Sequence, residues 1–169
     1  MYDIVATLAF LSLVVLAGVS DIRTRRIPNA LTVTGLGIAL ALRGAMGVEP
    51  LAAGLAGAVI AFVPAVPLVV LGGLGGGDAK LLAAVGAFVG PAGLPTTLLV
   101  TALMGGAMGA VTVVRRGAFG STVTRCRAIL AAPFGSSGEP LPRLGASGAI
   151  AIPYGVAIGA GALAGWWLP

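Results

Sequence analysis

Apolar residues form six runs along the chain, and polar or glycine-rich stretches separate each run from the next. A run of roughly 20 apolar residues can cross a bilayer as a helix. The pattern therefore predicts an all-α polytopic membrane protein, a bundle of about six transmembrane helices that forms a single domain over 1–169. The expected spans are 4–20, 30–46, 51–71, a short segment over 79–90 that the prolines of 91–95 end, 96–114 and 148–168.

The composition agrees with a membrane location. Of the 169 residues, 58% are hydrophobic and 9% are charged, whereas about a quarter of the residues in a soluble domain are charged. The first residues lack the basic segment of a cleaved signal peptide, so we expect the first run to remain as a membrane helix. Cys126 is the single cysteine and there is no histidine. A disulfide framework, a cysteine-rich metal site and the commonest general base are therefore excluded.

Basic residues indicate which side of the bundle faces the cytoplasm. If all six runs cross the bilayer, the stretches 21–29, 72–80 and 115–147 share one side and contain every basic residue except Arg43. Cytoplasmic loops carry an excess of Lys and Arg, so this side is predicted to be cytoplasmic and both termini to lie outside. Arg43 is expected to reach the outer interface along its own stem. The net charge of +5 follows from this topology and does not indicate nucleic-acid binding. The stretch 115–147 is expected to be disordered.

Two of the five acidic residues are candidates for chemistry. Asp3, Glu49 and Glu139 lie in positions where an ordinary solvated carboxylate is sufficient explanation. Asp21 and Asp78 each lie at the predicted cytoplasmic end of an apolar run, where ionisable groups are costly and often functional. Considered alone, Asp78 is well placed to be the N-cap of a helix, and Asp21 would be a juxtamembrane residue that follows one.

Considered together, the two aspartates predict acid/base chemistry. Two carboxyl groups brought close together do not both ionise easily, so one can act as a base while the other acts as an acid. The base can take a proton from a water molecule that attacks a peptide carbonyl, and the acid can protonate the developing oxyanion. The neighbouring glycines would let the backbone approach an extended substrate closely.

The two aspartates also lie in motifs that resemble a known family. "SDIRTRRIPN" and, much later, "GGGDAKLLAAVG" resemble the motifs of type IV prepilin peptidases, a branch of the GxGD intramembrane aspartic proteases. A third segment, "IPYGVAIGAGAL" at 152–163, is similar to the Pro-Tyr-Gly segment of the short members. The matching residues are Asp21, Arg23, Ile27, Pro28 and Asn29 in the first motif, and Gly75, Gly77, Asp78 and Lys80 in the second.

The resemblance implies an activity and a partner. It implies an inner-membrane endopeptidase that cleaves the basic leader from prepilins or pseudopilins after a small residue, near the cytoplasmic membrane face, with Asp21 and Asp78 as catalytic residues. The substrate helix would lie in the bilayer beside the enzyme. Long members carry an insertion with paired Cys-x-x-Cys motifs and also methylate the new terminus. This chain has neither the insertion nor the cysteines, so we expect a peptidase without a methyltransferase or soluble domain. Its short form is similar to the tight-adherence (Flp-type) pilus enzymes, and archaeal preflagellin peptidases, which are also small, are an alternative.

Other residues of the two motifs have simpler expected roles. Asn29 is expected to cap the second helix, with Pro28 stiffening the turn before it. Lys80 is either an interfacial anchor or a charge that keeps an aspartate ionised. Trp166 and Trp167 suit a membrane interface. Glycines four residues apart could let helices approach closely in lipid; these are the pairs Gly86/Gly90, Gly105/Gly109, Gly155/Gly159 and Gly161/Gly165.

Several rival functions remain open at this point. A small transporter or proton-conducting protein could use the same carboxylates, although it would predict acids near the bilayer midplane and inverted repeats. A phosphate-binding loop would need Gly-Lys-Ser/Thr after the glycines, which this chain lacks. A hydrolase using Ser20 and Lys80 is a third alternative. A divalent ion between the aspartates is conceivable, but two carboxylates make a poor site, and we expect no metal or other cofactor.

Overall fold

The structure, a computed structural model, describes residues 2–115, 117, 120 and 153–168. It contains the helices α1 (Tyr2–Thr24), α2 (Asn29–Met46), α3 (Val48–Val70), α4 (Gly76–Arg115) and α6 (Tyr154–Trp167). Within these described ranges there is no strand, and α1 to α4 are each long and apolar enough to cross a membrane. The predicted all-α membrane fold is therefore confirmed. Cys126, Glu139 and most of the predicted loop 115–147 lie outside the described residues.

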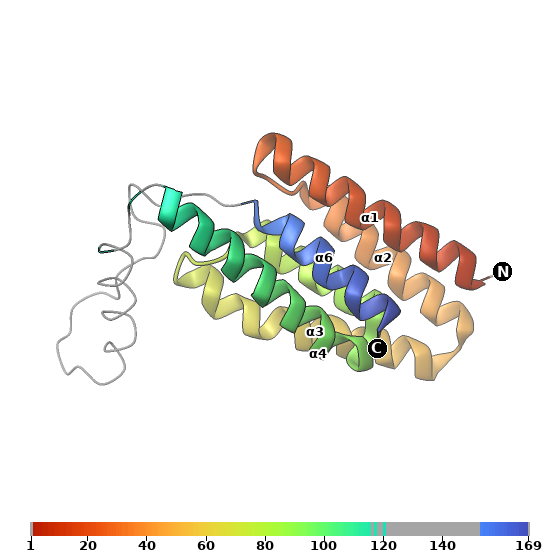
Figure 1. The fold of residues 1–169 in the computed structure, drawn as a ribbon. Coiled ribbons are helices and arrows are strands. Elements are labelled where there is room, and N and C mark those ends of the chain that lie inside the picture. Colours follow the sequence, from red (N-terminus) through yellow and green to blue (C-terminus); the bar gives the residue numbers. More distant parts are fainter. Residues whose placement is uncertain (1, 116, 118–119, 121–152, 169) are drawn as a thin grey trace, which may run out of the picture.

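A sharp turn at Gly90 divides α4 into two arms. Gly90 has φ 70° and ψ −179°, a left-handed φ that favours glycine, and Pro91 follows it. The second arm runs back toward the end of the bundle where α4 begins (Figure 1). The break expected at 91–95 is thus confirmed, one residue earlier. The six crossings and the outward termini stay predictions.

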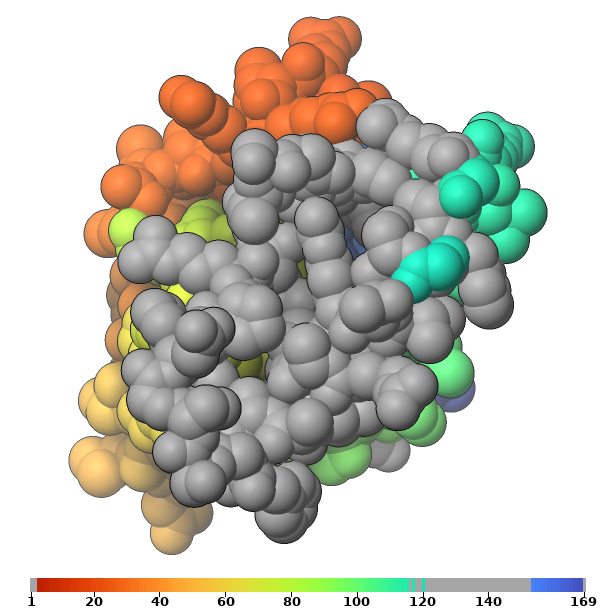
Figure 2. Space-filling model, turned by 90° about the vertical axis from the view of Figure 1, so that its left-hand side faces the viewer, coloured from red at the N-terminus to blue at the C-terminus, as the bar shows by residue number. Residues whose placement is uncertain are grey.

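The helices meet so that their functional ends gather on one side. The end of α1 and the starts of α2, α4 and α6 lie at the same end of the bundle, opposite the start of α1 and the end of α6 (Figure 1). Figure 2 looks onto this end, with the orange residues of α1 and α2 above and the teal end of α4 at the right. The two motifs are therefore brought to one end of the molecule.

Glycines let the helix backbones touch. A Cβ atom at Gly57 of α3 would overlap the backbone of Gly86 in α4, and one at Gly93 of α4 would overlap the backbone of Gly165 in α6. Close backbone approach between small residues is the usual way helices associate in lipid. The close packing expected of Gly86 and Gly165 is confirmed.

Arg43 turns inward and binds backbone carbonyls near the Gly90 turn. Its Nη2 donates a hydrogen bond of 2.7 Å to the carbonyl of Phe88, and its Nη1 donates one of 3.4 Å to the carbonyl of Pro50. The last carbonyls of a helix lack intrahelical partners, and the turn at Gly90 frees those at the end of the first arm. Arg43 thus has polar partners within the protein, and its reach to the outer interface stays a prediction.

Three aromatic rings join α1, α4 and α6 at the end of the bundle where α4 turns at Gly90. The rings of Phe10 and Trp166 stack with centroids 4.6 Å apart, and the ring of Phe88 meets that of Phe10 edge-on at 5.5 Å. Trp166, expected at a membrane interface, therefore packs into the bundle. Trp167 is 65% exposed and remains the candidate for an interfacial side chain.

The backbone contact between α3 and α4 predicts that Gly57 tolerates no side chain. Gly57→Ala should lower the midpoint of thermal unfolding in detergent, since an overpacked core position costs about 1–3 kcal/mol. Gly37→Ala is the matched control, because nothing lies within 4 Å of a Cβ at Gly37, and it should leave the midpoint unchanged or slightly higher. Equal midpoints for the two variants would contradict the packing described here.

Candidate active site

Asp21 lies in the last turn of α1 and is held by the start of α6. Its side chain is buried, with 5% exposed, and its Oδ2 accepts a hydrogen bond of 2.6 Å from the backbone N–H of Gly155. Gly155 is in the first turn of α6, where backbone N–H groups have no partner within the helix and the helix dipole favours a carboxylate. The expectation that Asp21 follows its helix is wrong, since α1 continues to Thr24.

Gly155 must be a glycine for this contact to form. A Cβ at Gly155 would lie 2.8 Å from Oδ2 and 3.0 Å from Cβ of Asp21. In the sequence, Gly155 stood out in two ways: within the segment that carries the resemblance, and as half of the pair Gly155/Gly159. The glycine pair was the available signal for a close backbone contact.

Asp78 lies in the first turn of α4 and binds back to the loop before it. The backbone N–H of Gly75 donates a hydrogen bond of 3.1 Å to Oδ2 of Asp78. Because α4 begins at Gly76, Asp78 is the third helical residue, and the N-cap is Gly75, three positions before the predicted one. A side chain at this third position that binds the N-cap N–H is half of a capping box. A Cβ at Gly75 would lie 2.8 Å from the same oxygen.

The carboxyl groups of Asp21 and Asp78 are close enough to interact electrostatically. Tyr154, the residue before Gly155, interacts electrostatically with Asp78 as well, and its ring occupies the place that a side chain at Gly105 would fill. Three helices thus place two carboxyl groups and one phenol at the same end of the bundle. The sequence placed Tyr154 in the Pro-Tyr-Gly segment but assigned it no role, because no spacing rule connects it to either aspartate.

The remainder of the first motif packs directly on the second. Ile27 is buried, and a Cβ at Gly77 would lie 3.2 Å from both the Cβ and the carbonyl oxygen of Ile27. The connection between α1 and α2 therefore lies against the first turn of α4. This contact gives Gly77 a steric role and fixes the distance between the two aspartate-bearing segments.

Lys80 and Asn29 form a second link between the motifs. The Nζ of Lys80 donates a hydrogen bond of 2.8 Å to Oδ1 of Asn29. Pro28 is the N-cap of α2, with φ −60° and ψ 134° and no side-chain cap bond, so the prediction that Asn29 caps α2 is wrong. Asn29 is the first helical residue, and its amide turns to the lysine instead.

Ser20 is occupied by the turn that follows α1. Its hydroxyl donates a hydrogen bond of 2.8 Å to the carbonyl of Arg26, and the hydroxyl of Thr24 donates one of 3.1 Å to the same carbonyl. Arg25, between Thr24 and Arg26, has a left-handed φ of 52°. The Ser20 and Lys80 side chains thus have separate partners, which argues against a serine–lysine pair. In the part of the chain that the structure describes, no three acidic, histidine or cysteine side chains form a metal-binding group.

Comparisons with known proteins agree with these motifs. A sequence model of the type IV leader peptidase family matches residues 8–110, a range that includes Asp21 and Asp78 and stops before α6. A curated protein of Bacillus subtilis (strain 168), named prepilin leader peptidase/N-methyltransferase, is 31% identical over 113 residues. The alignment covers 66% of this chain and 46% of that protein, so the chain spans about half the length of this relative. Comparison with solved structures gave no match.

The contact between Asp21 and α6 predicts the effect of a single methyl group. Gly155→Ala should displace the carboxyl group of Asp21 and raise the labelling of Asp21 by a membrane-permeant carbodiimide. It should also lower the midpoint of thermal unfolding, because a hydrogen bond to a charged group contributes about 1.5–3 kcal/mol. Gly18→Ala, three residues before Asp21 on α1, is the control, since a Cβ at Gly18 has no neighbour within 4 Å. Labelling of Asp21, read by mass spectrometry, should be the same for Gly18→Ala and wild type; if Gly155→Ala also matches wild type, the contact is not required.

Proposed function

Because the chain belongs to the type IV leader peptidase family, we propose that it is a membrane-embedded aspartic endopeptidase that cleaves the basic leader from prepilins or pseudopilins. The observation that carries this proposal is that Asp21 in the last turn of α1 and Asp78 in the first turn of α4 lie at the same end of a helical bundle (Figure 1), each bound by a backbone N–H. The excess of arginines at this end favours the cytoplasmic face of the inner membrane as the place of cleavage.

The two carboxyl groups suffice for the hydrolysis of a peptide bond. One carboxylate takes a proton from water while the water oxygen attacks the carbonyl carbon of the scissile bond. The other carboxyl group, in its protonated form, gives its proton to the carbonyl oxygen. Collapse of the tetrahedral intermediate breaks the C–N bond. The leaving nitrogen receives a proton from the first carboxyl group, and the second carboxylate takes back a proton from a hydroxyl of the intermediate. The products are the carboxylic acid of the leader, which ionises in water, and the amine of the mature chain.

The backbone around the aspartates is arranged to hold them and to receive a substrate. The N–H groups of Gly155 and Gly75 each bind one carboxyl group, which fixes both side chains before substrate arrives, and such positioning is a large part of catalysis. Gly72, Gly73, Gly75 and Gly76 are exposed. A strand of substrate can add to an exposed backbone of this kind, which suits a peptide that must leave its helix before it is cut.

The chain is proposed to act as a peptidase alone, over a single domain. The Bacillus relative is named as a peptidase and an N-methyltransferase, but the 169 residues here contain no Cys-x-x-Cys pair. The position of the acids also favours a protease over a transporter. Asp21 and Asp78 lie in the last turn of α1 and the first turn of α4, whereas a transporter would be expected to carry them near the midplane.

The proposal predicts that both aspartates are required for cleavage. Asp21→Asn and Asp78→Asn should each lower the rate of leader removal by at least about 10³-fold, in the range expected when a general acid or base is lost. The rate can be measured by gel mobility of a prepilin co-reconstituted with the enzyme in liposomes. Glu49→Gln, at the start of α3, is the control and should cleave at the wild-type rate. Substantial cleavage by either Asn variant, in protein that inserts normally, would refute the two-aspartate mechanism.

A further inference from the structure

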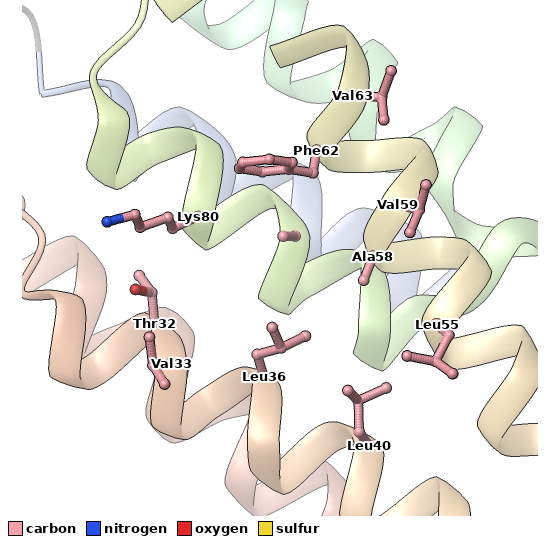
Figure 3. A pocket seen from close by; sticks show the side chains of 11 residues that line it. Thr32, Val33, Leu36, Leu40, Leu55, Ala58, Val59, Phe62, Val63 and Lys80 are labelled. Atoms are coloured by element: carbon pink, nitrogen blue, oxygen red, sulfur yellow. The ribbon is translucent and has the colours of Figure 1, made fainter. Parts of the chain in front are cut away.

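A groove with a volume of about 440 Å³ lies between α2 and α3, with the first arm of α4 as its floor. Its walls are almost entirely apolar, and Lys80 lies at one end (Figure 3). On α2 the wall residues include Thr32, Leu36 and Leu40, and on α3 they include Leu55, Val59 and Val63. No described residue of α1 or α6 lines the groove, so the groove is separate from the contact between Asp21 and α6.

The walls have the spacing of a helix-binding surface. Each wall is a row of residues four apart, and such rows are the ridges between which a packing helix inserts its side chains. Each row extends over eight residues, or about 12 Å at 1.5 Å per residue, which matches about two turns of a docked helix. Ala58 and Ala83 also line the groove, and their small side chains leave room for the side chains of such a helix.

The lysine end of the groove leads to the candidate active site. Lys80 is two residues after Asp78 in the first turns of α4, so the two lie about 3 Å apart along the helix axis and on roughly opposite faces. The Lys80 ammonium has three N–H donors, and Oδ1 of Asn29 accepts a hydrogen bond from one of them. The other donors can bind carbonyl groups of a polypeptide that passes this end of the groove.

We propose that the groove between α2 and α3 binds the apolar helix of the substrate, with the cleaved end of that helix at Lys80. This inference rests on the proposed peptidase function. From Lys80 the substrate continues as an extended strand across the exposed glycines of 72–76 toward Asp78. A strand advances about 3.3 Å per residue, so about four unwound residues cover 13 Å, enough to pass from one face of α4 to the other.

The test compares two valines of nearly equal solvent exposure on different helices of the bundle. Val59 in the groove is 57% exposed, and Val15 on α1 is 58% exposed. For a prepilin with its helix, Val59→Trp should raise KM about tenfold with little change in kcat, as expected when binding common to ground and transition states is lost. Val15→Trp should leave both constants unchanged. A soluble substrate peptide that ends before the apolar helix should be cleaved equally by wild type and Val59→Trp.

Cross-linking separates this proposal from the proposed function. A photoreactive amino acid at position 59 in the Asp78→Asn background should cross-link to the prepilin helix, and the same group at position 15 should not. If position 59 cross-links to the prepilin helix but the enzyme with both aspartates intact cleaves no prepilin, the groove is supported and the proposed peptidase function is refuted. Normal cleavage with an unchanged KM for Val59→Trp, and cross-links from 59 to lipid alone, would overturn the groove as the helix site.

Discussion

The buried carboxyl group of Asp21 accepts a hydrogen bond from the first turn of α6, and the geometry of the site depends on that contact. A buried polar group without a partner costs several kcal/mol, so Asp21 holds its position only while α6 supplies the N–H of Gly155. The position of α6 is set in turn by α4, whose Gly93 meets Gly165 backbone to backbone. One polar contact at the end of the bundle is thus maintained by steric contacts along its length.

The first turn of α4 serves two faces of the molecule. The Asp78 carboxyl group binds back to Gly75, while Lys80, on the roughly opposite face of the helix, turns to Asn29 and the groove beside α2. Between them, Gly77 packs on Ile27 and joins this turn to the connection that follows Asp21. The two motifs therefore form one structural unit, in which the spacing of Asp78 and Lys80 on the helix sets the relation between the acid pair and the groove.

The features that could be predicted from the sequence are those with a local physical cause. Apolar runs predict helices, prolines at 91–95 predict the break in α4, and two acids at the ends of apolar runs predict a pair. Helix ends near Asp21 and Asp78 were misplaced by a few residues. The sequence also carried no sign of side-chain partners far apart in the chain. Arg43 binds a carbonyl 45 residues away and Lys80 binds an amide 51 residues away. Tertiary packing decides such contacts, and no local pattern in one sequence reports them.

The separation of 134 residues between Asp21 and Gly155 has a consequence for biosynthesis. Helices α1 to α4 leave the ribosome before α6, so the nascent chain carries both aspartates while the N–H that orients one of them has yet to be made. The carboxyl group of Asp21 is therefore held in place only when translation has passed Gly155 and α6 has docked on the helices made before it.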